Sequence, residues 1–67
     1  MATNLTAIEE AILNADDVNR GLGALGRLLY ADPNLRGIGD LIDIIHISMA
    51  RHLAEAQFAL KRLEKQQ

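Results

Sequence analysis

The stretch Tyr30-Ala31-Asp32-Pro33-Asn34 divides the chain of 67 residues into two halves of similar length. Asp is a frequent N-cap residue, and proline fits the first position of a helix, where its missing N–H group costs nothing. The same proline disfavours helical geometry at Asp32, the residue before it. The stretch therefore predicts that one helix ends near Tyr30 or Ala31 and that a second helix begins at about residue 33.

The first half has the pattern of an amphipathic helix over about residues 5–31. Thr6 followed by Glu9 is typical of a capping box, in which each side chain bonds to the backbone N–H of the other residue. Apolar residues recur at alternating spacings of three and four, which predicts a heptad seam facing another helix. The members of this seam are Ile8, Ala11, Ala15, Val18, Leu22, Leu25 and Leu29.

Three glycines, Gly21, Gly23 and Gly26, fall within this first helix. Each costs about 1 kcal/mol relative to alanine in a helix interior. Either the helix is continuous and the glycines allow another backbone to approach, or it breaks between Arg20 and Gly23. Because the heptad seam keeps its phase across the glycines, we predict a continuous helix.

The second half has the pattern of a helix over about residues 33–65. Gly37 and Gly39 weaken its opening turn, and Asp40 offers a second N-cap. A strand over residues 41–48 is the rival interpretation, but the run continues without interruption into a segment rich in Ala, Leu, Lys, Glu and Gln. The spacing instead predicts an apolar helical stripe formed by Ile42, Ile45, Met49, Leu53, Ala56, Leu60 and Leu63.

The distribution of charge favours an antiparallel arrangement. Residues 1–19 contain four acidic side chains and no basic one, whereas Lys61, Arg62 and Lys65 lie near the other end of the chain. In an antiparallel hairpin the start of the first helix lies beside the end of the second, so acid meets base there. The sequence therefore predicts one all-α domain over residues 1–67, an antiparallel helical hairpin.

The second helix carries more apolar residues than one partner helix can cover. At about 100° per residue, Ile44, Ile47 and Phe58 fall opposite the apolar stripe, in line with Arg51 and Ala54. We favour self-association, in which two hairpins form a homodimeric four-helix bundle. The other interpretations are a docking surface for a different protein and isolated exposed apolar residues. The pattern leaves open whether this stripe is the dimer interface or the docking surface.

A second candidate patch for partner binding lies at the turn between the helices. It contains Tyr30 with Arg27 and Arg36 nearby, and Arg51 occupies the middle of the stripe on the second helix. Arg and Tyr are enriched at binding hot spots. The alternative role for Tyr30 is a hydrophobic plug at the end of the bundle. The alternative for Arg51 is a side chain whose stem covers apolar surface.

The residue types and their spacings argue against catalysis, a metal site or a cofactor. The chain has no cysteine, and His46 and His52 are six residues apart, so they point in different directions on one helix. Asp43 with His46, and His52 with Glu55, supply only two ligands each, and no further carboxylate lies on the opposite seam. The glycines of residues 21–26 match G-x-G-x-x-G in spacing but lack the preceding strand of a nucleotide-binding loop. We expect a protein that is not an enzyme.

The net charge of −2 and the pI of about 5.5 argue against general nucleic-acid binding. The N-terminal residues lack the pattern of a signal peptide, and no apolar run reaches the length of a membrane span, so we expect a cytoplasmic protein.

The favoured function is a small regulator or inhibitor that binds a partner protein, of the kind found in accessory gene sets of phages and plasmids. The alternative is a nucleic-acid-binding regulator, either helix-turn-helix or an RNA binder whose plan, a dimer of short helical hairpins, resembles Rop.

Overall fold

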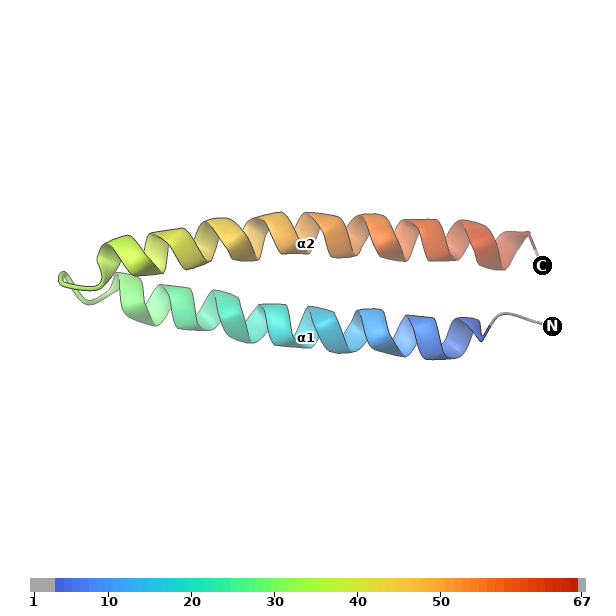
Figure 1. The fold of residues 1–67 in the computed structure, drawn as a ribbon, viewed down its shortest axis with the longest axis horizontal. Coiled ribbons are helices and arrows are strands. Elements are labelled where there is room, and N and C mark those ends of the chain that lie inside the picture. Colours follow the sequence, from blue (N-terminus) through green and yellow to red (C-terminus); the bar gives the residue numbers. More distant parts are fainter. Residues whose placement is uncertain (1–3, 67) are drawn as a thin grey trace.

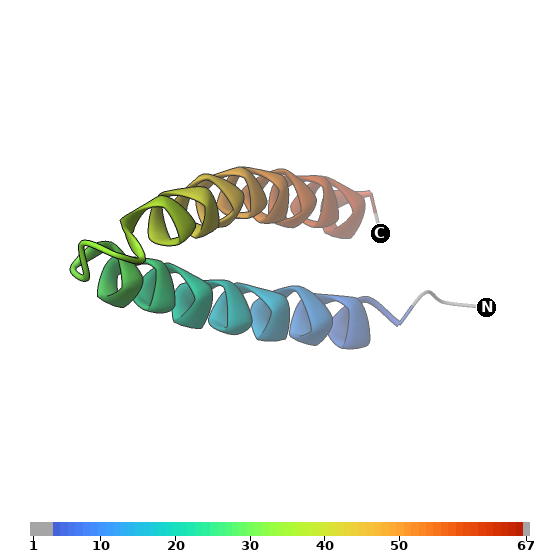
Figure 2. The same ribbon diagram turned by 60° about the vertical axis from the view of Figure 1, so that its left-hand side comes forward.

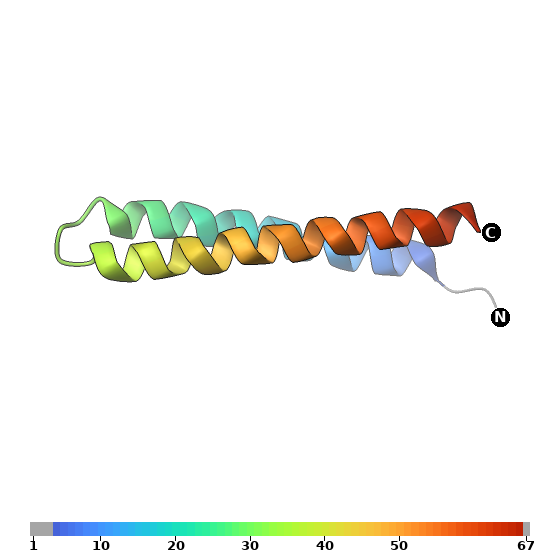
Figure 3. The ribbon, with the colours of Figure 1, turned by 90° about the horizontal axis from the view of Figure 1, so that it is seen from above.

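The computed structural model describes residues 4–66, which form two α-helices joined by a short turn. Helix α1 spans Leu5–Tyr30 and helix α2 spans Arg36–Lys65. The helices lie side by side and antiparallel, and the Cα atoms extend over 53 × 15 × 12 Å (Figures 1 and 2). Seen from above, the helices cross at a shallow angle (Figure 3). The prediction of an all-α antiparallel hairpin is confirmed.

Helix α1 begins at Leu5, as predicted, but its N-cap lies two residues before the predicted cap at Thr6. The side-chain oxygen of Asn4 accepts a hydrogen bond from the backbone N–H of Ala7 (3.1 Å), and the Asn4 carbonyl accepts one from Ile8 (3.3 Å). Asn4 is therefore the N-cap, and its amide satisfies an N–H group that the helix itself leaves unpaired. The predicted capping box at Thr6 is wrong, because Thr6 already lies inside the first turn of the helix.

The turn uses Asp32 in a different way from the one predicted. The Asp32 carboxylate accepts a hydrogen bond from the N–H of Asn34 (2.9 Å), and the Asp32 carbonyl accepts one from Leu35 (3.0 Å). This arrangement is an Asx turn, which holds the backbone of residues 32–35 outside the helix. Helix α1 ends at Tyr30 as predicted, but the predicted start of the second helix at residue 33 is wrong, since helix α2 begins at Arg36.

Helix α1 is continuous through its glycines, as predicted. Three glycines lie where the helices touch. A Cβ atom on Gly39 would lie 2.5 Å from the backbone nitrogen of Tyr30 and 2.7 Å from the carbonyl oxygen of Gly26. A Cβ atom on Gly23 would lie 2.7 Å from the ring of His46. The glycines therefore allow a direct contact between the two backbones near the turn, which any larger residue would prevent.

Asn19 and His46 join the two helices in the middle of the hairpin. The Asn19 side-chain amide donates a hydrogen bond to the His46 carbonyl (3.1 Å), and His46 Nδ1 lies 2.8 Å from the Asn19 carbonyl. Because a carbonyl oxygen can only accept, His46 Nδ1 carries the proton in this contact. Asn19 is only 4% exposed, and its side-chain oxygen has no hydrogen-bond partner within residues 4–66. A buried polar pair of this kind fixes the register of two helices.

Replacing Asn19 with alanine tests the contribution of this pair. We expect Asn19→Ala to lower the free energy of unfolding by about 1–2 kcal/mol, because the interhelical hydrogen bond is lost and a gap remains. Asn14→Ala is the matched control, since Asn14 is exposed on the same helix and its replacement improves helix propensity. Urea denaturation of both variants at equal protein concentration measures the difference. Equal stability of the two variants would show that the pair does not stabilise the hairpin.

The face of helix α1 that contacts helix α2 is displaced from the predicted heptad seam by about one residue, or about 100°. Every seventh residue from Leu5 to Gly26 lies on the contact face, including Asn19. On the predicted seam, by contrast, Val18 is 74% exposed. Of the predicted seam only Leu22 and Leu29 are half-buried, so the prediction that it packs directly against the second helix is wrong for most of its length. The physical reason is that Gly23, Gly26 and Gly39 allow a closer approach of the backbones than the branched side chains of the seam.

The predicted stripe on helix α2 is only partly covered. Leu53 and Ala56 are half-buried and Leu60 is buried, whereas Ile45, Met49 and Leu63 remain exposed. At 5% exposure, Leu60 is the one buried apolar side chain among residues 4–66. The core of a single hairpin is therefore very small.

The exposed surface of the hairpin is large for its mass. It amounts to 5278 Å², whereas a compact protein of 7.4 kDa exposes about 4,200 Å². The radius of gyration is 15.6 Å, against about 11 Å for a compact domain of this length. An isolated hairpin thus leaves about 1,100 Å² more surface in water than a compact protein of equal mass.

Candidate interaction surfaces

The two histidines of the hairpin, both on helix α2, have separate neighbours. Within the described residues, no group of three or more His, Asp or Glu side chains is placed to hold a metal ion. His46 is hydrogen-bonded to Asn19, and His52 lies 3.7 Å from Glu55 on the surface. The features that remain to be explained are exposed apolar surfaces.

Over residues 4–66, neither helix has a segment long and apolar enough to cross a membrane.

The first surface is the outer stripe, which we define as Ile44, Ile47, Arg51, Ala54 and Phe58 on helix α2. All five residues are exposed, and Ile44, Ile47 and Phe58 have exposed fractions of 59%, 59% and 64%. A shallow depression runs between Ile44, Ile47 and Arg51. The structure therefore brings these predicted site residues together on the side of helix α2 that faces away from helix α1.

Arg62 extends the outer stripe toward the end of helix α2. Its guanidinium carbon lies 5.3 Å from the centre of the Phe58 ring, which is the distance of a cation–π contact. A second depression is lined by Arg51, Glu55, Phe58 and Arg62 together with three alanines. Arg62 was not among the predicted site residues. Its spacing of four from Phe58 is the signal that could have indicated the contact.

The turn patch of Arg27, Tyr30 and Arg36 is brought together only in part. The Arg36 guanidinium lies 5.1 Å from the centre of the Tyr30 ring and donates a hydrogen bond to the Tyr30 carbonyl (3.2 Å). This carbonyl is at the end of helix α1, where the helix supplies no partner, so Arg36 caps the helix. Arg27 instead donates to the Gly23 carbonyl of its own helix (3.5 Å). Tyr30 is half exposed and does not fill the end of the hairpin.

One side of the two-helix layer is charged. Glu9 of helix α1 and Gln57, Lys61 and Glu64 of helix α2 line a groove between the helices, above Ile12 and Leu60. Glu9 on one wall thus faces a wall that carries both Lys61 and Glu64. Both ion pairs found in the described part of the chain, however, join residues of the same helix.

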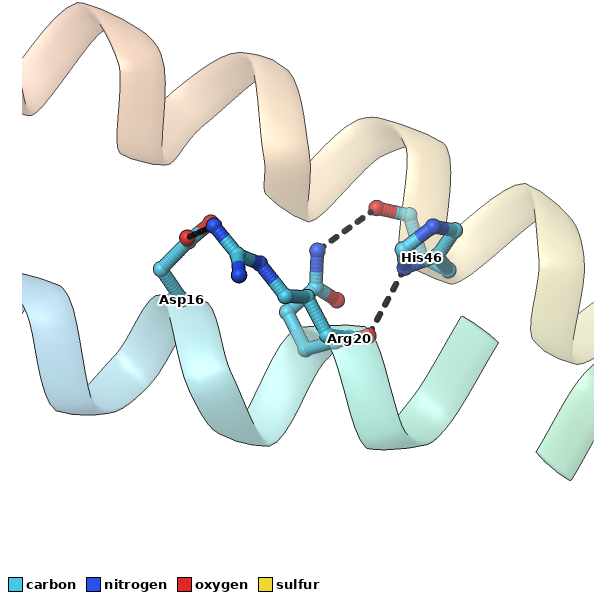
Figure 4. Close-up of polar contacts among 4 residues, drawn as sticks. Asp16, Arg20 and His46 are labelled. Atoms are coloured by element: carbon cyan, nitrogen blue, oxygen red, sulfur yellow. Dashed lines mark hydrogen bonds and ion pairs between the residues drawn. The ribbon is translucent and has the colours of Figure 1, made fainter. Parts of the chain in front are cut away.

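The Asp16–Arg20 ion pair continues this charged side along helix α1. The two side chains are 3.0 Å apart, one turn from each other, and lie near the contact of His46 with helix α1 (Figure 4). The side chains of the charged side therefore follow the helix contact over much of its length.

The other side of the layer is apolar. Glu9 and Gln57 line the groove on one side of the helix contact. On each helix, the residues on the other side of the contact positions therefore face the opposite side of the layer. These residues include the predicted seam of helix α1 and much of the predicted stripe of helix α2. None of the seam or stripe residues is Asp, Glu, Lys or Arg. We call this side the charge-free face and define it by its large exposed members: Ile8, Val18, Leu25, Ile38, Ile45 and Met49.

The sequence pattern placed these residues correctly on one stripe of each helix but with the wrong neighbours. We predicted that the two stripes face each other. The stripe of helix α2 faces helix α1 only in part, through Leu53, Ala56 and Leu60, and its exposed members lie beside the seam of helix α1 on one surface.

No family model, curated protein or solved structure matches this chain.

Proposed function

We propose that the hairpin is a non-enzymatic protein-interaction module, which acts as a homodimeric regulator or inhibitor by binding a partner protein through the outer stripe. The observation that carries the proposal is the exposure of Ile44, Ile47 and Phe58 around a central arginine. Soluble proteins rarely expose contiguous apolar patches, and those that occur commonly bind other proteins. A cluster of aromatic, aliphatic and arginine side chains is the composition of a binding hot spot.

The charges of the chain favour a protein partner over nucleic acid. The net charge is −2, and the two arginines at the turn are both hydrogen-bonded to backbone carbonyls. Affinity for nucleic acid depends mainly on Lys and Arg that neutralise phosphates. Gel-shift assays at low salt test this alternative. Binding that disappears in a chain with Arg27→Ala and Arg36→Ala would replace our proposal with a nucleic-acid function.

A single substitution in the outer stripe tests partner binding. We expect Ile47→Asp to reduce capture of the partner by at least about tenfold, because a charge enters an apolar contact. Tagged chains would be used for affinity purification from the native host, and the partner identified with the wild type would then be purified and titrated. Asn14→Asp is the control, since it adds the same charge at an exposed position of helix α1.

The mass of the Ile47→Asp variant in solution separates the two roles of the stripe. If the stripe binds the partner, the Ile47→Asp variant loses capture of the partner but keeps the mass of the wild-type assembly. A fall in mass would assign the stripe to self-association, and unchanged capture of the partner would remove the stripe from the binding site.

A further inference from the structure

The charge-free face is an extended apolar surface with contributions from both helices. Ile8 and Leu25 on helix α1 are 17 residues apart, which corresponds to about 25 Å along the helix. Val18 lies between them and is 74% exposed, although it is β-branched and apolar. On helix α2, Ile45 and Met49 are also exposed. Neither helix of the hairpin covers this surface.

The surface that the hairpin exposes in excess of a compact protein is similar in area to the surface that each partner buries in a stable dimer. Each partner in a stable interface buries about 800 Å². The hairpin exposes about 1,100 Å² more than a compact protein of its mass. Association of two hairpins through one face each would therefore bury, on each chain, an area close to the excess surface that the single chain leaves in water.

We propose that a second copy of this chain covers the charge-free face and that the outer stripe remains free on the outside of the dimer. This assignment of faces rests on the homodimer of the proposed function and goes beyond it. Two layers of two helices stacked on their charge-free faces form a four-helix bundle, in which the stripes of all four helices meet at the centre. The charged sides, with Glu9 and Lys61, then point to solvent.

The alternative dimer, formed through the outer stripe, is disfavoured by charge. A two-fold interface brings a patch against its own copy. Arg51 lies at the middle of the stripe, midway between Ile44 and Phe58, so a pairing centred on the stripe places two Arg51 guanidinium groups close to the axis. Glu55 lines the same depression as Arg51, but the removal of charged groups from water costs free energy even when an opposite charge is near. None of the residues that define the charge-free face is charged.

Two adjacent isoleucines provide a matched test of the assignment. Ile45 lies on the charge-free face and is 48% exposed, whereas Ile44 lies on the outer stripe and is 59% exposed. We expect Ile45→Lys to raise the dissociation constant of the dimer by at least about a hundredfold, because a two-fold interface buries the introduced charge twice. We expect Ile44→Lys to change it by less than about threefold, since its side chain stays in water. Sedimentation equilibrium over a range of concentrations measures both constants.

A milder variant, Val18→Ser, tests the assignment of faces if Ile45→Lys does not fold. Val18→Ser changes a side chain that the hairpin itself leaves exposed, so we expect retained helicity by circular dichroism and a dissociation constant raised by about tenfold. Dissociation caused by Ile44→Lys and not by the other two variants would overturn the assignment of faces while leaving the homodimer intact. A wild-type chain that stays monomeric would overturn both the assignment and the homodimer. Loss of partner capture by Ile47→Asp reports on the docking function separately.

Discussion

Gly39→Ala is expected to lower the free energy of unfolding by about 3 kcal/mol and the midpoint of thermal unfolding by more than about 10 °C. The added methyl group would lie 2.5 Å from the Tyr30 nitrogen and 2.7 Å from the Gly26 carbonyl oxygen. Both are backbone atoms, so the clash can be relieved only by moving the helices apart at the turn. Such movement would also weaken the packing of Ile42 on Gly26.

Gly37→Ala is the matched control for this substitution. Gly37 lies on the same helix, and no atom outside its own helix segment lies within 4 Å of the position of its Cβ. Alanine there improves helix propensity by up to about 1 kcal/mol, so we expect a small increase in stability. Calorimetry of the two variants at equal protein concentration measures the difference. Equal effects of Gly37→Ala and Gly39→Ala would contradict the close backbone contact at the turn.

Leu60→Ala is expected to have the second-largest effect on stability. Leu60 is buried between the helices, and removal of its side chain leaves a cavity that costs about 2–3 kcal/mol. For a domain of this size, that loss is a large part of the total free energy of unfolding. Urea denaturation with the linear extrapolation gives the value directly.

Phe58→Ala is the control for Leu60→Ala. Its side chain is larger but lies exposed on the outer stripe, so its removal should change the free energy of unfolding by less than about 0.5 kcal/mol. A cost for Phe58→Ala that exceeds the cost for Leu60→Ala would show that another chain buries the outer stripe in the folded protein. That result would contradict the proposed arrangement of the dimer.

The architecture of the hairpin follows from the sequence because the signals for it are local. Asp32 and Pro33 mark the turn, and the spacing of apolar residues indicates a helix on each side of it. The ends of the helices were less predictable, since Asn4, Thr6 and Asp32 are all good caps. Which of these caps is used depends on which backbone N–H group each side chain reaches in the folded chain.

The glycines of helix α1 were expected to allow another backbone to approach, but the face of each helix that makes the contact could not be predicted from apolar spacing. Gly23, Gly26 and Gly39 contribute no hydrophobicity, and Asn19 is polar, yet these residues form the centre of the contact. Their role depends on two backbones that approach each other across the hairpin, which is not a property of either helix alone. The outer stripe could be predicted, because its residues are defined by their spacing on one helix. The charge-free face could not, because it combines residues of both helices.

We expect a second chain to supply the missing part of the hairpin core. Sedimentation equilibrium of the wild-type chain over a wide range of concentrations tests it most directly. We expect a mass of twice the 7.4 kDa of one chain, which falls toward that of the single chain only on dilution. A mass of 7.4 kDa at all concentrations, for a chain with the circular dichroism of a folded helical protein, would contradict this expectation.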